Sequence, residues 1–202
     1  MTCFALLTTC LALQLAQAQQ AAPPPPSRFY VQSAYSVGED NAAFVADAGW
    51  PRINLAYVMG FTDYFDVTFK ADHRYGKSFR VGMRAMLQLV DLNRVFDLGV
   101  FFEPLFYAMF RGGPSSAGAD LNAGVTMGVR LSPRVNLYGE ALHSSRLASK
   151  REYFSNGPLA RIGLEVCILR GFNIFAYGTG QWFWEDLAPE YGGGLGLAFW
   201  LQ

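Results

Sequence analysis

Apolar and polar residues alternate with a period of two along most of this chain. In residues 121–131, LNAGVTMGVRL, one face carries Leu, Ala, Val, Met, Val and Leu, and the other carries Asn, Gly, Thr, Gly and Arg. The segments 64–74, 78–90 and 158–169 alternate in the same way. Successive side chains of a strand point to opposite faces, whereas an amphipathic helix needs apolar spacings of three and four. The pattern therefore predicts strands.

About ten segments of this kind follow one another, separated by turn-forming residues. Short and longer connectors alternate between them, which is typical of an up-and-down antiparallel barrel whose two ends differ. Both termini then lie at the end with the short turns. The stretch GEDNAAFVADAG, residues 38–49, is interpreted as one of the longer loops. The predicted strands are 28–38, 51–60, 64–74, 78–90, 95–110, 121–132, 135–146, 158–169, 172–184 and 190–201.

The apolar faces of these strands decide the environment of the barrel. Each face is long enough for a tilted strand to cross a bilayer, and the opposite faces are rich in glycine, which is unusual for a solvated surface. The sequence therefore predicts an all-β fold, an up-and-down antiparallel transmembrane β-barrel of about ten strands, with eight as the alternative count. A secreted lipocalin-like barrel with its apolar face inward is the alternative environment. Aromatic residues expected at the membrane interfaces are Trp50, Tyr64, Trp182, Trp184 and Trp200.

Charged residues fall on the faces that would point into the lumen. The interior of a barrel of this size is filled by side chains, and buried charges need partners. We therefore expect an ion-pair network that closes the lumen, with the inward glycines leaving room for the long arginines. A narrow polar channel for ions or small solutes is the alternative. The expected lumen residues are Asp66, Lys70, Asp72, Arg80, Arg84, Asp97, Glu103, Arg130, Glu140, Arg161 and Glu165.

The N-terminal region has the composition of an export signal. Residues 1–18 are predicted to be a signal peptide, 19–27 a Pro-rich periplasmic spacer, and 28–202 the barrel. Cleavage would remove Cys3 and Cys10, so Cys167 would have no disulfide partner within the mature chain. The formal net charge is zero, which gives no electrostatic case for binding nucleic acid. Arg146, Lys150 and Arg151 are expected in an outer loop, where they would contact lipopolysaccharide phosphates.

The last strand carries a second signal. Gly196, Phe199 and Leu201 in GLGLAFWL resemble the C-terminal assembly signal of bacterial outer-membrane proteins, although the chain ends on Gln202. As a pattern, the mature chain resembles the small OmpA/OmpX-type barrels of Gram-negative bacteria. The resemblance implies a porin-like barrel of the outer membrane, inserted by the barrel-assembly machinery and surrounded by lipid and lipopolysaccharide. It implies a non-catalytic structural or interaction component of the cell envelope, which associates with an envelope protein partner in a larger membrane assembly.

One short motif raises an enzymatic alternative. His143 and Ser145 resemble the His-x-Ser of outer-membrane lipid A deacylases, in which histidine activates the serine nucleophile. Arg146 stands where that family has Asn, and Glu140 falls on the opposite face of the strand from His143. The sequence contains no phosphate-binding loop, Cys/His metal spacing or nicotinamide fingerprint. We therefore expect no enzyme activity, cofactor or metal, and name no catalytic residue.

Overall fold

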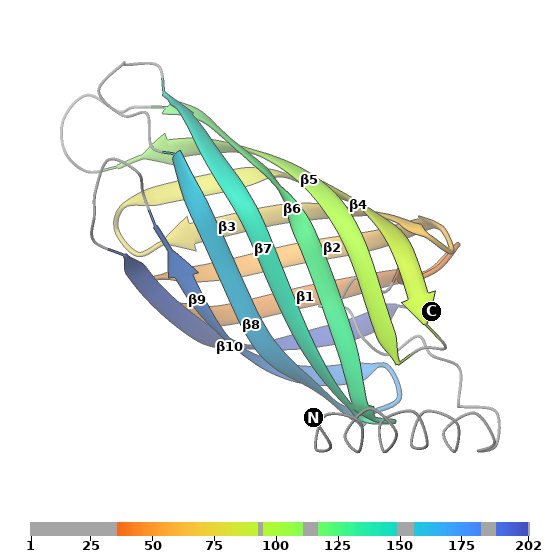
Figure 1. The fold of residues 1–202 in the computed structure, drawn as a ribbon. Coiled ribbons are helices and arrows are strands. Elements are labelled where there is room, and N and C mark those ends of the chain that lie inside the picture. The colour runs from red at the N-terminus through yellow and green to blue at the C-terminus, as the bar shows by residue number, and fades with distance from the viewer. Residues whose placement is uncertain (1–35, 93–94, 111–116, 149–155, 183–188, 202) are drawn as a thin grey trace, which may run out of the picture.

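The described chain forms one closed barrel of ten antiparallel strands (Figure 1). A computed structural model describes residues 36–92, 95–110, 117–148, 156–182 and 189–201. The predicted signal peptide and Pro-rich spacer lie outside these residues. The strands are β1 (Ala42–Trp50), β2 (Arg52–Thr62), β3 (Phe65–Arg74), β4 (Ser78–Leu92), β5 (Phe96–Met109), β6 (Ala117–Ser132), β7 (Val135–Ala148), β8 (Asn156–Leu169), β9 (Phe172–Gln181) and β10 (Glu190–Leu201).

The strand order is that of an up-and-down barrel. Each strand pairs with its neighbour along the chain, and β1 pairs with β10 to close the sheet. Ala42 at the start of β1 lies opposite Leu201 at the end of β10, so both ends of the barrel sequence meet at one rim. The predicted antiparallel barrel is confirmed, with ten strands and not eight.

The first predicted strand is wrong. Strand β1 runs from Ala42 to Trp50, inside the segment 38–49 that was interpreted as a loop. Residues 36–38, the described part of the predicted strand 28–38, are not in a strand. Pro51 alone connects β1 to β2. A short connection therefore stands where a long one was expected.

The two rims of the barrel differ in their connections. We call one rim the short-turn end, because residues 63–64, 93–95, 133–134 and 170–171 join the strands there. Each of these four hairpins contains a register shift, as between Gly60 and Thr62 or between Gln88 and Val90. Such bulges increase the local twist of the sheet. The opposite rim, the long-loop end, carries the connections 110–116, 149–155 and 182–189 as well as two shorter ones.

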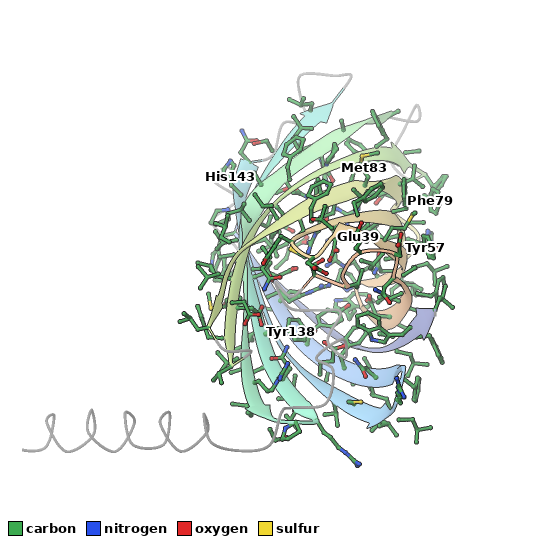
Figure 2. All side chains as sticks on the ribbon, turned by 90° about the vertical axis from the view of Figure 1, so that its right-hand side faces the viewer. Glu39, Tyr57, Phe79, Met83, Tyr138 and His143 are labelled. Carbon is green, nitrogen blue, oxygen red and sulfur yellow. The ribbon has the colours of Figure 1, made fainter. Side chains whose placement is uncertain are left out.

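The outer face of the barrel is apolar. Phe79, Val81 and Met83 on β4 are among many large exposed hydrophobic side chains, and Figure 2 shows Phe79, Met83 and Tyr57 on the outside. Among the described strand residues, no outward-facing position carries Asp, Glu, Lys or Arg. No helix among the described residues is long and apolar enough to cross a membrane. An apolar outside around a polar inside is the surface of a membrane-spanning barrel, not of a lipocalin-like one.

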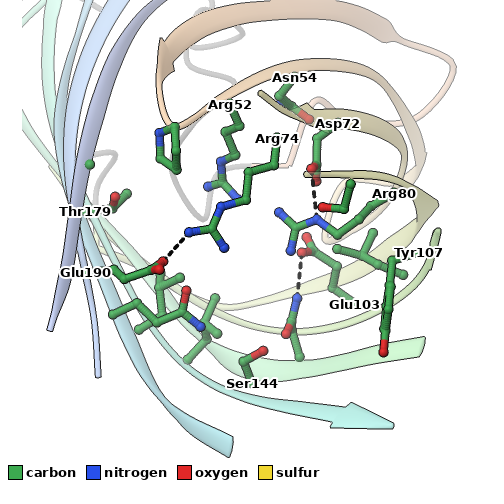
Figure 3. Close-up of a pocket in the computed structure, with 18 of the residues that line it drawn as sticks. Arg52, Asn54, Asp72, Arg74, Arg80, Glu103, Tyr107, Ser144, Thr179 and Glu190 are labelled. Carbon is green, nitrogen blue, oxygen red and sulfur yellow. Dashed lines mark hydrogen bonds and ion pairs between the residues drawn. The ribbon is translucent and has the colours of Figure 1, made fainter. Parts of the chain in front are cut away.

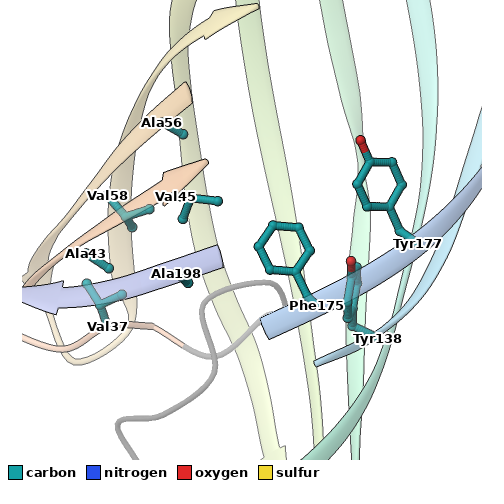
Figure 4. Close-up of a cluster of buried hydrophobic side chains, with 9 residues drawn as sticks. All are labelled: Val37, Ala43, Val45, Ala56, Val58, Tyr138, Phe175, Tyr177 and Ala198. Carbon is teal, nitrogen blue, oxygen red and sulfur yellow. The ribbon is translucent and has the colours of Figure 1, made fainter. Parts of the chain in front are cut away.

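The interior is divided into two layers. Toward the short-turn end lies an apolar cluster, with small aliphatic residues facing a group of aromatic rings (Figure 4). Buried polar side chains such as Glu165, Asn173 and Asn136 accompany it. Toward the long-loop end the interior is charged. We call these the apolar layer and the charged layer. The apolar layer consists of Val37, Ala43, Val45, Ala56, Val58, Tyr138, Phe175, Tyr177 and Ala198.

Two inward glycines lie beneath aromatic rings, whereas inward glycines were expected to leave room for arginines. A side chain at Gly196 would collide with the ring of Phe175, and one at Gly163 would collide with the ring of Tyr138. In both cases the glycine and the aromatic residue are paired across neighbouring strands. The missing side chains therefore allow these rings to lie flat against the wall and fill the lumen.

Candidate functional site

The centre of the charged layer is a branched ion-pair network. One oxygen of Glu103 accepts hydrogen bonds from Lys70 Nζ and Arg84 Nε, each at 2.7 Å, and the other accepts one from Asn122 Nδ2 at 3.0 Å. Arg84 also donates through Nη1 to Glu140. These residues come from β3, β4, β5, β6 and β7, so the network crosses the lumen.

A second group of ion pairs lies nearer the long-loop end. Arg80 donates to Asp72 at 2.8 Å and to Asp120 at 3.2 Å. Arg146 approaches Asp120 with both Nε, at 2.8 Å, and Nη2, at 3.0 Å. A bidentate guanidinium–carboxylate pair has well-defined geometry and strong hydrogen bonds. The Asp120 carboxylate thus joins β4 to β7 through β6.

Arg146 corrects the expectation of an outer loop that contacts lipopolysaccharide. It lies in β7, shares the inward phase of Glu140 and binds Asp120 inside the barrel. The predicted strand 135–146 ended at Arg146, and β7 continues to Ala148, so Arg146 lies within the strand and not at the start of the loop. The other two residues of that predicted loop site, Lys150 and Arg151, lie outside the described residues.

Three of these arginines also stack on aromatic rings. The guanidinium of Arg84 lies 4.0 Å from the ring centre of Phe101, and that of Arg161 lies 4.2 Å from the ring centre of Tyr177. Arg146 lies 4.9 Å from the ring centre of Tyr107. Cation–π contacts of this kind favour a cation where water is scarce. Arg161 also has a long ion pair with Glu140, at 3.8 Å.

The short-turn end is closed by residues that precede β1. Asp66 accepts hydrogen bonds from the Ser36 hydroxyl at 2.6 Å and from the Val37 amide at 3.0 Å. The amide of Ser36 donates to Gln88 Oε1 at 3.3 Å. These bonds hold Val37 inside the barrel, where its side chain is 1% exposed and joins the apolar layer. We call residues 36–38 the N-terminal cap.

A cavity enters the charged layer from the long-loop end (Figure 3). It has a volume of about 130 Å³ and is lined at its mouth by residues such as Arg74, which pairs with Glu190. A smaller hollow of about 50 Å³ lies deeper, against Val45 and Val58. Lys70, Arg84 and Arg161 line both spaces. These cations therefore lie between the cavity and the apolar layer.

The eleven predicted lumen residues all lie on the inner face, but they are not one network. Seven belong to the charged layer, whereas Asp66 holds the N-terminal cap. Asp97, Arg130 and Glu165 lie toward the short-turn end, where Glu165 is fully buried and accepts a hydrogen bond from Asn173 at 2.7 Å. The interior charge is thus concentrated in one half of the barrel.

The prediction omitted several inward polar residues. Asp47 accepts hydrogen bonds from Tyr177 at 2.6 Å and from Asn54 at 2.8 Å. Asp120 and Arg146 form the second group of ion pairs, and Arg52 lines the cavity. Arg52 and Arg146 lay within predicted strands in the inward phase, and Asp120 lay one residue before a predicted strand. The alternation could therefore have identified these three, whereas Asp47 belongs to the strand that was missed.

The predicted interfacial aromatics divide into two groups. Trp50, Tyr64 and Trp182 are exposed on the outside, near the rims. Trp200 corrects the prediction, because it lies in phase with the inward residue Ala198 and packs against the apolar layer. Trp184 lies outside the described residues.

The His-x-Ser motif lies on the outer face. His143 is exposed on the outside of β7 (Figure 2), and Ser145 has the same phase. Glu140 points the other way, into the lumen, where it binds Arg84. It therefore cannot orient His143 for catalysis. Among the described residues, no three His, Cys, Asp or Glu side chains are grouped as metal ligands.

Several solved structures are similar to this barrel. OmpTdeltaL8, a loop deletion mutant of the outer-membrane protein OmpT of Vibrio cholerae, is 11% identical with a TM-score of 0.43, covering 80% of this chain and 62% of its own. This chain thus spans less than two thirds of that protein. The N-terminal β-barrel domain of Pseudomonas aeruginosa OprF is 12% identical with a TM-score of 0.38, covering 80% and 96% of the two chains. The KdgM porin is 8% identical with a TM-score of 0.45, covering 79% and 98%. No protein-family model and no curated protein matches the sequence.

Proposed function

We propose that this protein is a closed β-barrel of a bacterial outer membrane and serves as a non-catalytic structural or interaction component of the envelope. One observation carries the proposal: two unlike layers fill the lumen in series. The charged layer crosses it through Glu103, Arg84 and Glu140, and the apolar layer, together with buried polar residues such as Glu165, fills the half toward the short turns. An ion that passes the first layer meets the second.

The placement in a membrane rests on the outer face. Burying an unpaired charge in hydrocarbon is costly, and the outward strand positions described here carry none. The aromatic residues Trp50 and Tyr64 lie near opposite rims, where amphipathic rings favour the lipid headgroups. In such barrels the short turns face the periplasm and the longer loops face outward. The cavity would then open to the exterior.

Conductance in planar bilayers tests whether the lumen is closed. The purified protein should insert without producing stable conductance steps. Replacing two rings of the apolar layer, Phe175→Ala with Tyr138→Ala, removes its two most deeply buried aromatic side chains and should raise the frequency of openings. Phe199→Ala, which removes an outward ring from the same region, is the matched control and should stay closed. Stable steps from the unaltered protein would contradict the proposal.

A narrow channel is the second candidate function. The observation that favours it is the second hollow, which continues the path of the cavity beyond Lys70 and Arg84. Val37 of the N-terminal cap then lies between this hollow and the short-turn end. A channel would open when the cap leaves the lumen.

One variant separates the two functions. Asp66→Ala removes the acceptor of the Ser36 hydroxyl and the Val37 amide, so it releases the cap. A gated channel should then conduct, whereas a barrel sealed by two layers should remain closed. Asp63→Ala, in the exposed turn before β3, is the matched control and should behave like the unaltered protein. If Asp66→Ala conducts while Asp63→Ala and the unaltered protein do not, the gated channel is the better description of the function.

The interaction role needs a partner, which native purification can identify. We propose that the barrel contacts lipopolysaccharide and an envelope protein, and that the barrel-assembly machinery inserts it through its last strand. Extraction in mild detergent should retain a stoichiometric envelope protein. Recovery of the barrel alone, after cross-linking in intact cells, would count against an assembly role.

A further inference from the structure

The cavity at the long-loop end has an excess of positive charge. Eight of its lining side chains are Lys or Arg, and four are Asp or Glu. Asp120, which pairs with the lining residues Arg80 and Arg146, raises the carboxylates to five. Among the described residues the cavity therefore has three more cations than anions.

Below the mouth of the cavity, the cation is the more exposed partner of each ion pair, whereas at the mouth Glu190 is 45% and Arg74 22% exposed. In the pairs that Arg84 forms with Glu103 and Glu140, the arginine side chain is 15% exposed and each carboxylate 5%. Arg146 is 25% exposed and Asp120 1%. The carboxylates lie behind the guanidinium groups, against the wall. A solute in the cavity therefore meets a surface that is mostly cationic.

Arg52 is the distinctive member of this surface. It makes no hydrogen bond or ion pair with any other residue that the structure describes. The charges that act on it most strongly are two cations, Arg161 and Arg80, followed by Asp72. The Arg52 guanidinium is part-exposed to the cavity and has no close anion, so an anion that supplies a partner there would bind favourably.

The surroundings of Arg52 form a recess. Arg52 pairs in register with Arg74 across β2 and β3, and Thr179 pairs with Arg161 across β8 and β9. Between them, β1 and β10 present residues without side chains, such as Gly192, which lines the cavity. Two arginine-bearing walls thus flank a floor of bare backbone, and the Thr179 hydroxyl lies at its side.

We propose that this recess binds a small anionic solute through carboxylate or phosphate oxygens, with Arg52 as the main donor and Arg161 and Thr179 beside it. Guanidinium groups match both kinds of oxygen pair with two parallel N–H donors. The cavity, with a volume of about 130 Å³, suits a small solute. Because the deeper layers are closed, the solute enters and leaves by the long-loop end. The binding site goes beyond the proposed function, and only its route of entry rests on the closed lumen.

Isothermal titration calorimetry of the full-length protein in zwitterionic detergent tests the site. Inorganic phosphate and citrate are titrated separately in a low-salt Tris chloride buffer, and glucose serves as the uncharged probe. We expect saturable binding of at least one anion, weakened by added sodium chloride, and none of glucose. Binding of phosphate alone, citrate alone or both identifies which oxygen chemistry the site accepts.

The variants locate the site at Arg52. Arg52→Gln should weaken anion binding at least tenfold, whereas Arg52→Lys should keep part of the affinity because it retains the charge. Arg134→Gln makes the same charge change in an exposed turn at the opposite rim and should bind like the unaltered protein. If Arg52→Gln does not fold, Thr179→Val, which keeps the side-chain shape, should still weaken binding several-fold.

Two results would overturn the inference. One is the absence of saturable binding of either anion to the unaltered protein. The other is that Arg52→Gln binds the anion as tightly as the control Arg134→Gln. If Arg52→Gln does not fold, the corresponding result is that Arg52→Lys and Thr179→Val both bind as tightly as Arg134→Gln. Because the readout is calorimetric, either failure is distinguishable from the conductance results that test the closed lumen.

Discussion

Glu103 is the carboxylate on which the charged layer converges, so its replacement is the most informative perturbation. It accepts hydrogen bonds from Lys70, Arg84 and Asn122. Among the described residues, Lys70 has no second ion pair, whereas Arg84 keeps Glu140. Glu103→Gln preserves the size of the side chain and removes its charge. Its amide oxygen can still accept from Lys70 and Arg84, while its amide NH2 faces the Asn122 amide, which can turn to present its oxygen. The substitution leaves the Lys70 ammonium inside the lumen without an anion.

The magnitude follows from the burial of the pair. Removing one partner of a buried ion pair costs about 3–5 kcal/mol, because the other charge stays buried. The Lys70 side chain is 16% exposed to the cavity, and Arg84 retains one anion. We therefore expect the lower end, a loss of about 3 kcal/mol in the free energy of unfolding. This corresponds to roughly a hundredfold change in the unfolding equilibrium.

Reversible urea unfolding in lipid vesicles, followed by tryptophan fluorescence, measures this loss. Glu190→Gln is the matched control, since it removes a carboxylate that pairs with Arg74 at the rim and is 45% exposed. An exposed ion pair contributes about 0–1 kcal/mol. The double variant Lys70→Met/Glu103→Gln removes both charges and should recover most of the stability, so a double-mutant cycle isolates the pair.

The reasoning is refuted if Glu103→Gln loses no more stability than Glu190→Gln. It is also refuted if the double variant is no more stable than Glu103→Gln alone. Either result would mean that cavity water, and not Glu103, solvates the Lys70 ammonium.

Two further predictions concern the wall of the barrel. Gly196→Ala drives a methyl group into the Phe175 ring and should cost about 1–3 kcal/mol, whereas Gly139→Ala meets its nearest atom, in Met127, at 3.5 Å and should be close to neutral in the same unfolding assay. Val125→Lys places a charge on the outer face at the middle of β6 and should cost about 2–4 kcal/mol in vesicles, against about 0–1 kcal/mol for Leu92→Lys near the short-turn rim. Equal losses within either pair would contradict the packing in the first case and the membrane placement in the second.

Most of the strands could be predicted because their two faces differ, and β1 shows why one was missed. In AAFVADAGW the inward residues Ala43 and Val45 are as apolar as the outward Phe44 and Ala46. Period-two alternation disappears where the interior itself is apolar. The neighbouring Gly, Asp and Asn then favour a loop interpretation. The N-terminal cap explains why the inward residues of β1 are apolar, because Val37 packs against this part of the barrel wall and favours apolar neighbours there.

The inward position of the charges could also be predicted, but their partners could not. Alternation alone places Arg84 and Glu140 inside. Their ion pair joins β4 to β7 across the lumen, between residues that are 56 positions apart. Which residues meet across a barrel depends on strand number, tilt and stagger together. No pattern within a single strand contains that information.

The inward charges have a consequence for the register of the sheet. A slip of one residue turns every side chain of a strand to the other face, so it would move Arg84 of β4 or Glu103 of β5 into lipid. That penalty selects the observed register for the charged strands. Strand β1, which closes the barrel, has one charged residue, Asp47. It lies opposite Asn54 of β2, to which it is hydrogen-bonded, and it also binds Tyr177 of β9 beyond β10. The same carboxylate thus connects both sides of the closing strand, and it supplies there the register information that ion pairs supply elsewhere in the barrel.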